Sequence, residues 1–244
     1  MPIVVPAAGP VRTAAGGGLE GMTSFVLVPG AGGRGWYWHR VVAELTRRGC
    51  AAVAVDLPAD DDSAGLAAYT DAVLAALPAE PAVLVAQSMG GLTAPLVAVR
   101  APVRGIVLVN GMVPRPGETG GDWWTATGQA AAQAAAAARE GRPFDPGDLA
   151  DAFLHDLPPD LRAAPEMTEP VTQSGTPFAD PWPLSAWPDV PTRVLAGRDD
   201  RFFPLEFQRR VACERLGLAV EAVPGGHLVA LSRPAELVDR LLAG

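Results

Sequence analysis

The sequence contains no lysine, two cysteines and three histidines among its 244 residues, and all nineteen basic residues are arginine. The absence of lysine excludes Schiff-base chemistry, lysine-anchored pyridoxal phosphate and a P-loop. The two cysteines, Cys50 and Cys213, offer neither a disulfide framework nor the spacing of metal ligands. We therefore expect a protein that uses neither a metal ion nor a cofactor.

Long hydrophobic runs and an excess of positive charge are also missing. No apolar stretch reaches membrane-spanning length, and the N-terminus lacks the basic and apolar regions of a secretory signal. The formal net charge of −8 at pH 7 disfavours contact with a phosphate backbone. We expect a soluble, cytoplasmic protein that binds no nucleic acid and no membrane.

Short apolar segments alternate with segments of helical spacing through most of the chain. The segments typical of buried strands are 25–28, 51–55, 83–86, 106–109, 192–196 and 218–223. The helical segments are 36–48, 64–77, 91–100, 204–216 and 234–242. This alternation predicts an α/β fold with a doubly wound, mostly parallel sheet.

Two parts of the chain fall outside this alternation. Residues 1–21 are rich in Pro, Ala and Gly, and we expect a disordered tail with at most a short strand at Ile3–Val5. Residues 113–187, after the strand ending near Asn110, contain many prolines, four tryptophans and three helix-like pieces. We interpret them as a helical cap inserted into a core of residues 22–112 and 188–244.

The segment Ala86-Gln87-Ser88-Met89-Gly90 stands between a predicted strand and a predicted helix. A serine flanked by small residues two positions away on both sides is typical of a nucleophile elbow. In such a turn, backbone strain lifts the hydroxyl above the edge of the sheet. Five residues with two variable positions recur by chance, so the weight of this motif depends on its surroundings.

The ends of two later strands supply the partners that a serine nucleophile needs, because ligands bind beyond the carboxyl ends of such strands. Asp199 and Asp200 follow the strand at 192–196, and His227 follows the last strand. Serine, aspartate and histidine in this chain order predict a triad. Ser88 would attack, His227 would act as general base, and Asp200 would orient the imidazole. The spacing from the strand end favours Asp200 over Asp199.

A tetrahedral intermediate needs preorganised hydrogen-bond donors for its oxyanion. The backbone N–H of Met89, directly after the nucleophile, is one candidate donor. The other is the backbone N–H of Ala31, in the glycine-rich loop that follows the first strand.

These residues resemble the α/β-hydrolase superfamily over nearly the whole chain from about Thr23. Phe25–Gly33 with Trp36 and Trp38 is similar to the oxyanion loop of the plant methylesterase and hydroxynitrile-lyase branch and its bacterial relatives, although Pro29-Gly30 replaces the common His-Gly. Asp56-Leu57-Pro58, Ser88–Gly91 and Gly197–Pro204 are also similar to that branch. The resemblance implies an α/β-hydrolase fold with a Ser-His-Asp triad of the carboxylic ester hydrolase type. The plant lyases carry a lysine after the catalytic histidine, where this chain has Leu228, so lyase activity by that route is not expected.

We predict a serine hydrolase that cleaves a small to medium apolar or aromatic ester through an acyl-serine intermediate. A thioesterase, a lactonase or an acyl transferase would use the same triad. The aromatic residues of the cap either line the pocket or join the cap to the core. The acidic residues of the cap, such as Asp156, are expected on a solvated helix face. The candidate pocket residues are Gly30, Gly32, Trp36, Met112, Trp123, Trp124, Phe153, Trp182 and Leu228.

Two alternatives belong to other functional classes. Gly30-x-Gly32-x-x-Gly35 followed by Asp56 fits the dinucleotide fingerprint of an NAD(P)-dependent oxidoreductase. That alternative leaves Ser88, Asp200 and His227 unexplained, and Trp36 to Trp38 put bulk where a pyrophosphate would approach. The other alternative is a binding or receptor protein that keeps the hydrolase fold without turnover.

Overall fold

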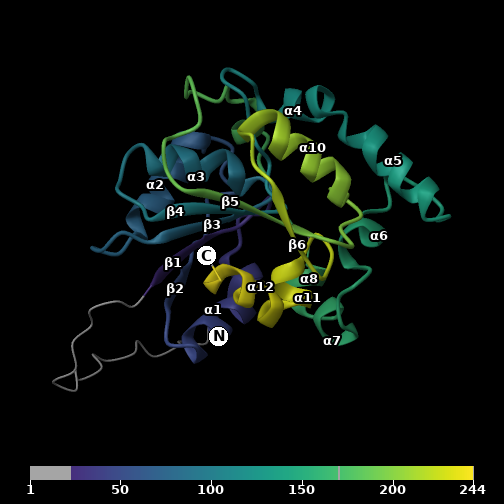
Figure 1. Cartoon of the computed structure of the whole chain (residues 1–244), viewed down its shortest axis with the longest axis horizontal. Helices are drawn as coiled ribbons and strands as arrows, with labels where there is room; N and C mark the ends of the chain where they lie inside the picture. The colour runs from purple at the N-terminus through teal and green to yellow at the C-terminus, as the bar shows by residue number, and fades with distance from the viewer. Residues whose placement is uncertain (1–22, 170, 244) are drawn as a thin grey trace, which may run out of the picture.

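Figure 1 presents a computed structural model of the chain, which describes residues 23–169 and 171–243. The predicted tail at residues 1–21 and its short strand at Ile3–Val5 lie outside the described residues.

Six strands form one parallel sheet in the order β2-β1-β3-β4-β5-β6. The predicted doubly wound sheet is confirmed, and each strand lies within two residues of its predicted bounds. Because all six strands are parallel, their carboxyl ends lie along one edge, where the loops carrying Ser88, Asp200 and His227 meet. The strands are β1 (Ser24–Val28), β2 (Ala51–Ala54), β3 (Val83–Gln87), β4 (Gly105–Val109), β5 (Thr192–Gly197) and β6 (Val220–Val223).

Helices cover both faces of the sheet (Figure 1). On one face, α1 (His39–Arg47) packs against α12 (Pro234–Leu242), and their apolar side chains join one hydrophobic core. On the other face, α2 (Leu66–Ala75), α3 (Gly90–Ala98) and α10 (Leu205–Leu216) contribute to a second core. None of the described helices has the length and apolar character needed to cross a membrane.

Three local features differ from the sequence prediction. The first predicted helix begins with a 3₁₀ turn, η1 (Gly35–Trp38), which helical spacing alone does not separate from α-helix. A further helix, α11 (Val229–Ser232), follows His227 and is too short to produce a periodic pattern. Strand β6 begins two residues late, because the Leu218 N–H still bonds to Ala212 O of α10 at 3.4 Å.

The segment between β4 and β5 contains six described helices rather than three. Three of them are single turns with proline in the first turn, which hydrophobic periodicity does not detect. Residues 117–119 and 181–182 lie antiparallel at the base of this segment, through hydrogen bonds between Gly117, Glu118 and Trp182. The helices are α4 (Gly120–Thr127), α5 (Gln129–Arg139), α6 (Leu149–Leu154), α7 (Pro159–Arg162), α8 (Pro165–Thr168) and α9 (Thr176–Ala179).

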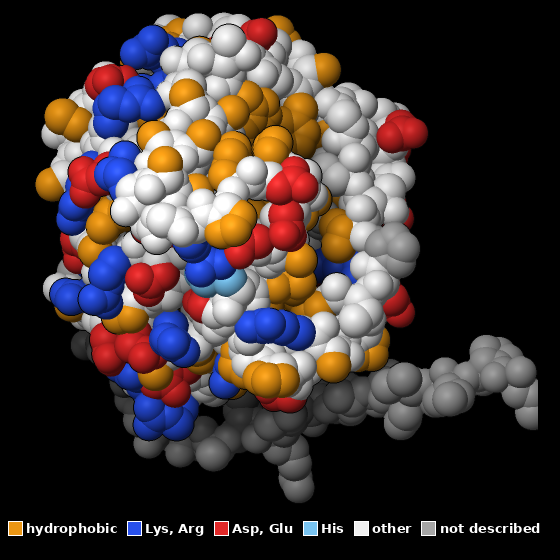
Figure 2. Space-filling model, turned by 90° about the vertical axis from the view of Figure 1, so that its right-hand side faces the viewer, with side chains coloured by type: hydrophobic (Ala, Val, Ile, Leu, Met, Phe, Trp, Pro, Cys, Tyr) orange, Lys and Arg blue, Asp and Glu red, His pale blue; other side chains and the backbone are white. Residues whose placement is uncertain are grey.

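Charged side chains of both signs lie next to one another on the face shown in Figure 2, interspersed with hydrophobic ones. Many arginines of the described residues form ion pairs with carboxylates; Arg142, for example, contacts both Glu140 and Asp151. The described part of this face therefore presents no continuous basic surface.

A buried ion pair lies at the base of the segment between β4 and β5, which is called the cap from here on. Arg215 of α10 pairs with Glu118, and their side chains are only 2% and 9% exposed. Arg215 also donates to Val113 O at 2.7 Å. We expect Arg215→Met to lower the free energy of unfolding by about 3–5 kcal/mol, because it leaves the Glu118 carboxylate buried and unpaired.

Urea unfolding monitored by circular dichroism measures this loss. The matched control is Arg209→Met, which removes the exposed pair with Glu206, whose side chains are 47% and 68% exposed. That change should cost less than about 1 kcal/mol. Equal losses for the two variants would contradict the role assigned to the buried pair.

Candidate active site

Ser88 lies in the turn between β3 and α3 with a backbone φ of 49°, a left-handed conformation that a non-glycine residue adopts only under constraint. Its N–H donates to Val109 O at 3.2 Å, and its carbonyl accepts from Met112 N at 2.9 Å. A Cβ at Gly90 would lie 2.8 Å from Pro29 O. The small residue two positions after Ser88 is therefore required by the close approach of the β1 carboxyl end.

The structure brings Ser88, His227 and Asp200 into one chain of hydrogen bonds. His227 Nε2 lies 3.1 Å from Ser88 Oγ, and His227 Nδ1 lies 2.8 Å from Asp200 Oδ2. All three residues are buried. This arrangement has the geometry of a hydroxyl next to a base, with the base oriented by a carboxylate.

The two adjacent aspartates occupy different positions. Asp200 Oδ1 accepts the N–H groups of Phe202 and Phe203, both at 2.8 Å, which leaves Oδ2 facing the imidazole. Asp199 is exposed, and its Oδ2 accepts from Gly225 N at 3.2 Å. The carboxylate that contacts His227 is therefore that of Asp200.

The two predicted oxyanion donors are the backbone N–H groups of Ala31 and Met89. Among residues 23–169 and 171–243, neither the Ala31 N–H nor the Met89 N–H donates a hydrogen bond. An oxyanion that forms during the attack of a serine on a carbonyl is stabilised by backbone N–H groups that have no other acceptor.

Three phenylalanine rings surround the imidazole of His227. The ring centroids of Phe153, Phe202 and Phe203 lie 5.1, 5.1 and 5.0 Å from that of His227. Phe153 comes from helix α6 of the cap, and Trp124 of α4 packs against Phe202 at 5.7 Å. Among the predicted pocket residues, Phe153 and Trp124 thus belong to the aromatic group beside the imidazole.

Two other predicted pocket tryptophans lie in the hydrophobic core instead. Trp123 is buried against Phe203 and Phe207, and its Nε1 donates to Val113 O at 3.0 Å. Trp182 is also buried, and its Nε1 donates to Leu92 O of α3 at 3.1 Å. Both indoles therefore join the cap to the core, which is the other interpretation that the sequence allows.

The remaining predicted pocket residues have different surroundings. A Cβ at Gly30 would meet Ser88 Cβ at 2.9 Å, so Gly30 lies directly against Ser88. Met112 is buried beneath the elbow, while Leu228 follows His227 at the start of α11. Trp36 stacks on the ring of His39 at 4.7 Å.

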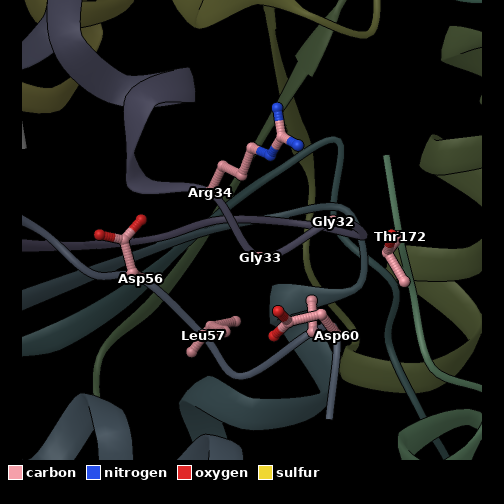
Figure 3. Close-up of a pocket in the computed structure, with 8 residues that line it drawn as sticks. Gly32, Gly33, Arg34, Asp56, Leu57, Asp60 and Thr172 are labelled. Carbon is pink, nitrogen blue, oxygen red and sulfur yellow. The ribbon is translucent and has the colours of Figure 1, made fainter. Parts of the chain in front are cut away.

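A cavity of about 200 Å³ lies beside the glycine-rich loop rather than at Ser88. Thr172, Gly32 and Asp60 all line this cavity. In Figure 3, Thr172 of the cap lies beside Gly32, and Asp60 lies below them. Gly32, another predicted pocket residue, lines this cavity. Asp56, which the dinucleotide alternative would assign to a ribose, accepts instead from Gly35 N at 2.7 Å.

Asn110 is a residue whose importance the sequence did not reveal. It is fully buried with a φ of 48°, and its Nδ2 donates to His227 O at 3.0 Å and to Gly226 O at 3.2 Å. Its Oδ1 accepts from Gly197 N at 2.7 Å. Asn110 therefore joins the ends of β4 and β5 to the histidine loop.

Asp156 also contacts the histidine loop, whereas we expected it on a solvated face. Its Oδ2 accepts from Gly226 N at 2.7 Å, so a cap carboxylate satisfies the backbone next to His227. On the opposite side, Tyr37 Oη accepts from Ala230 N at 3.5 Å. Burial raises the pKa of the Tyr37 phenol well above its usual range, so this hydroxyl stays neutral.

Comparison with known proteins identifies the family. A family model described as the alpha/beta hydrolase family matches residues 25–240. The probable esterase PIR7A of Oryza sativa subsp. indica is 30% identical over 259 aligned positions, which cover 91% of this chain and 97% of that protein.

Solved structures agree in fold. The pyrethroid hydrolase of Sphingobium faniae JZ-2 is 24% identical with a TM-score of 0.72, over 91% of this chain and 96% of that one. The methylesterase MES16 of Arabidopsis is 19% identical with a TM-score of 0.68, over 91% and 98%. The predicted resemblance and α/β-hydrolase fold are confirmed, and the chain belongs to the alpha/beta hydrolase family.

Proposed function

We propose that the protein is a serine hydrolase that cleaves an apolar or aromatic carboxylic ester through an acyl-serine intermediate. The hydrogen-bonded chain from Ser88 Oγ through His227 to Asp200 is the observation that carries this proposal. Membership of the alpha/beta hydrolase family and an esterase-named relative support ester hydrolysis in general.

Acylation begins when Ser88 Oγ attacks the ester carbonyl carbon and its proton moves to His227 Nε2. The carbonyl electron pair moves onto oxygen, and the N–H groups of Ala31 and Met89 stabilise this oxyanion. Collapse of the intermediate breaks the carbon–oxygen bond, and the leaving alkoxide takes the proton from His227. Asp200 holds the imidazole in the required tautomer and stabilises its protonated form.

Deacylation repeats these steps with water as the nucleophile. His227 takes a proton from water as hydroxide adds to the acyl carbon. The tetrahedral intermediate then collapses, its bond to Ser88 Oγ breaks, and protonated His227 returns the proton to Ser88 Oγ. The carboxylic acid then leaves. A thioester or a lactone could replace the ester in the acylation steps, and an alcohol could replace water in deacylation. Thioesterase, lactonase and acyl transferase activities therefore remain alternatives.

The aromatic rings beside His227 support an apolar or aromatic leaving group. His227 gives its proton to the leaving oxygen, so the leaving group must lie next to the imidazole, where Phe153 and Phe202 stand. By their names, the methylesterase named above acts on an ester and the pyrethroid hydrolase hydrolyses a pyrethroid.

Phe153→Ala tests this assignment of the leaving-group side. We expect the KM for a phenyl or benzyl ester to rise about tenfold, because one aromatic contact of about 1 kcal/mol is lost together with buried area. The kcat for the same ester should change much less. Phe144→Ala is the matched control, since Phe144 is an exposed cap phenylalanine. Steady-state kinetics with the ethyl and benzyl esters of one acid give KM and kcat for each variant. An equal rise in KM for the two esters in Phe153→Ala would contradict an aromatic leaving-group site.

The two alternatives of other classes make different predictions. A hydrolase-fold binding protein would bind an ester without turnover, and an oxidoreductase would shift its melting temperature with NAD(P). The Asp56–Gly35 hydrogen bond and the family assignment do not favour the oxidoreductase.

Intact-mass labelling with a fluorophosphonate probe tests the proposed function directly, because phosphonylation needs an activated serine. We expect one adduct on the folded wild type, and none on Ser88→Ala or on urea-unfolded wild type. An unlabelled wild type that is shown to be folded would contradict a working Ser88–His227 pair.

A further inference from the structure

A glutamine of the cap, Gln173, contacts the loop that carries the proposed oxyanion donor Ala31. The Gly32 N–H donates to Gln173 Oε1 at 2.8 Å. Within residues 23–169 and 171–243, this is the only hydrogen bond to the peptide group that joins Ala31 to Gly32. Gln173 therefore holds the peptide directly adjacent to the free Ala31 N–H.

The side chain of Gln173 is itself fixed by two donations. Its Nε2 donates to Tyr69 Oη at 3.0 Å and to Ser174 O at 2.8 Å. Tyr69 lies on α2 and is fully buried, and burial raises the pKa of its phenol, so the hydroxyl stays neutral. The amide thus links the loop to a rigid helix of the core.

The surrounding cap segment is docked on the same part of the core. Ser174 N donates to Ala59 O at 2.7 Å, and Thr176 Oγ1 donates to Asp62 O at 2.7 Å. Gly32 has a φ of +87°, and a Cβ there would lie 2.3 Å from Val171 Cγ1, so the cap lies directly on the loop. Figure 3 shows the neighbouring Thr172 beside Gly32.

We propose that Gln173 is a positioning residue for the oxyanion hole, which couples docking of the cap to the placement of the Ala31 N–H. The glycines at positions 30, 32 and 33 give the loop unusual backbone freedom. A donor must lie within a few tenths of an ångström of its catalytic position, so a loop of this kind needs an external restraint. Gln173 supplies this restraint from the cap. This inference rests on the proposed serine-hydrolase function.

Gln173→Met keeps the length of the side chain and removes the acceptor. We expect kcat for an activated ester to fall about tenfold to a hundredfold, with KM changed by less than about threefold, because the oxyanion forms only after binding. The inhibition constant of an aryl trifluoromethyl ketone, whose Ser88 adduct carries an oxyanion, should rise by the same factor as kcat/KM falls.

Three further variants separate positioning from general structure. Thr176→Val removes another cap–core hydrogen bond of the same segment and should leave kcat and the ketone affinity unchanged. Gln173→Glu keeps the oxygen acceptor but loses both Nε2 donations, so it should restore only part of the kcat lost in Gln173→Met. Tyr69→Phe removes only the phenol oxygen and should give a smaller loss of the same kind, which provides a test even if Gln173→Met fails to fold.

The outcomes distinguish this inference from the proposed function. Ser88-dependent turnover with unchanged kcat in Gln173→Met, or a kcat loss without a parallel loss of ketone affinity, would overturn the positioning role alone. Equal effects of Gln173→Met and Thr176→Val would do the same. A wild type without Ser88-dependent turnover or phosphonylation would overturn the proposed function, and this inference with it.

Discussion

Ser88→Ala is expected to lower kcat for ester hydrolysis by about six orders of magnitude, which is the loss seen when a triad nucleophile is removed. The hydroxyl is the only group in the proposed mechanism that forms a bond to the substrate, and no described neighbour is placed to replace it. Release of alcohol from an activated ester, followed spectrophotometrically at high enzyme concentration, measures the residual rate.

The protein should fold normally without the hydroxyl. The strained turn is held by backbone hydrogen bonds of Ser88 to Val109 and Met112, and alanine has the same Cβ as serine. The free energy of unfolding should therefore change by less than about 0.5 kcal/mol. Ester hydrolysis at the wild-type rate by a folded Ser88→Ala protein would exclude the acyl-serine mechanism.

Asp200→Asn is expected to lower kcat about 10⁴-fold. An asparagine retains an oxygen that accepts the N–H groups of Phe202 and Phe203. Its amide nitrogen, placed against His227 Nδ1, would favour the tautomer that carries its proton on Nε2, which cannot take the proton of Ser88. The imidazolium formed during the reaction would also lose its carboxylate partner.

Asp199→Asn is the matched control for this prediction. Asp199 is exposed, and among the described residues its only hydrogen bonds are with the backbone of Gly225. We expect kcat to change by less than about threefold, since the asparagine oxygen still accepts that hydrogen bond. Rates measured for both variants across pH 5–9 decide the assignment. A severe loss in Asp199→Asn with a mild one in Asp200→Asn would reassign the acid.

The fold was predictable because its signal is local. The central strands β1, β3 and β4 are short, largely apolar runs, since strands in the middle of a parallel sheet are buried on both faces. The edge strands β2 and β6 are only partly buried. Such runs alternate with amphipathic helices, so every core strand was found within two residues of its observed bounds. The helices of a single turn, including α11 and three cap helices, were missed because four residues are too few to establish a period.

The order of the three reactive residues was also readable, because a parallel sheet sends every strand end to the same edge. Ser88, Asp200 and His227 each follow a strand directly, so topology alone predicts that they meet. The choice between Asp199 and Asp200 followed from their spacing after β5. The hydrogen bonds of Asp200 with Phe202, Phe203 and His227 explain in physical terms why that spacing matters.

The roles of Asn110, Asp156 and Gln173 depend instead on contacts between residues far apart in the chain. Asn110 bonds to residues more than eighty positions away, and Gln173 bonds to Gly32 across 141 positions. No local pattern marks such partners, because an asparagine after a strand or a glutamine in a loop also serves as a surface residue.

The sequence by itself determined the parallel sheet, the chain order of Ser88, Asp200 and His227 at the strand ends, and the family. These properties depend on residue type and on spacing within single elements. Only the tertiary structure decided which aromatic rings contact His227 and which are core. It also decided which side chains hold the loops around Ser88, because side-chain packing and buried hydrogen bonds depend on the relative placement of elements distant in sequence.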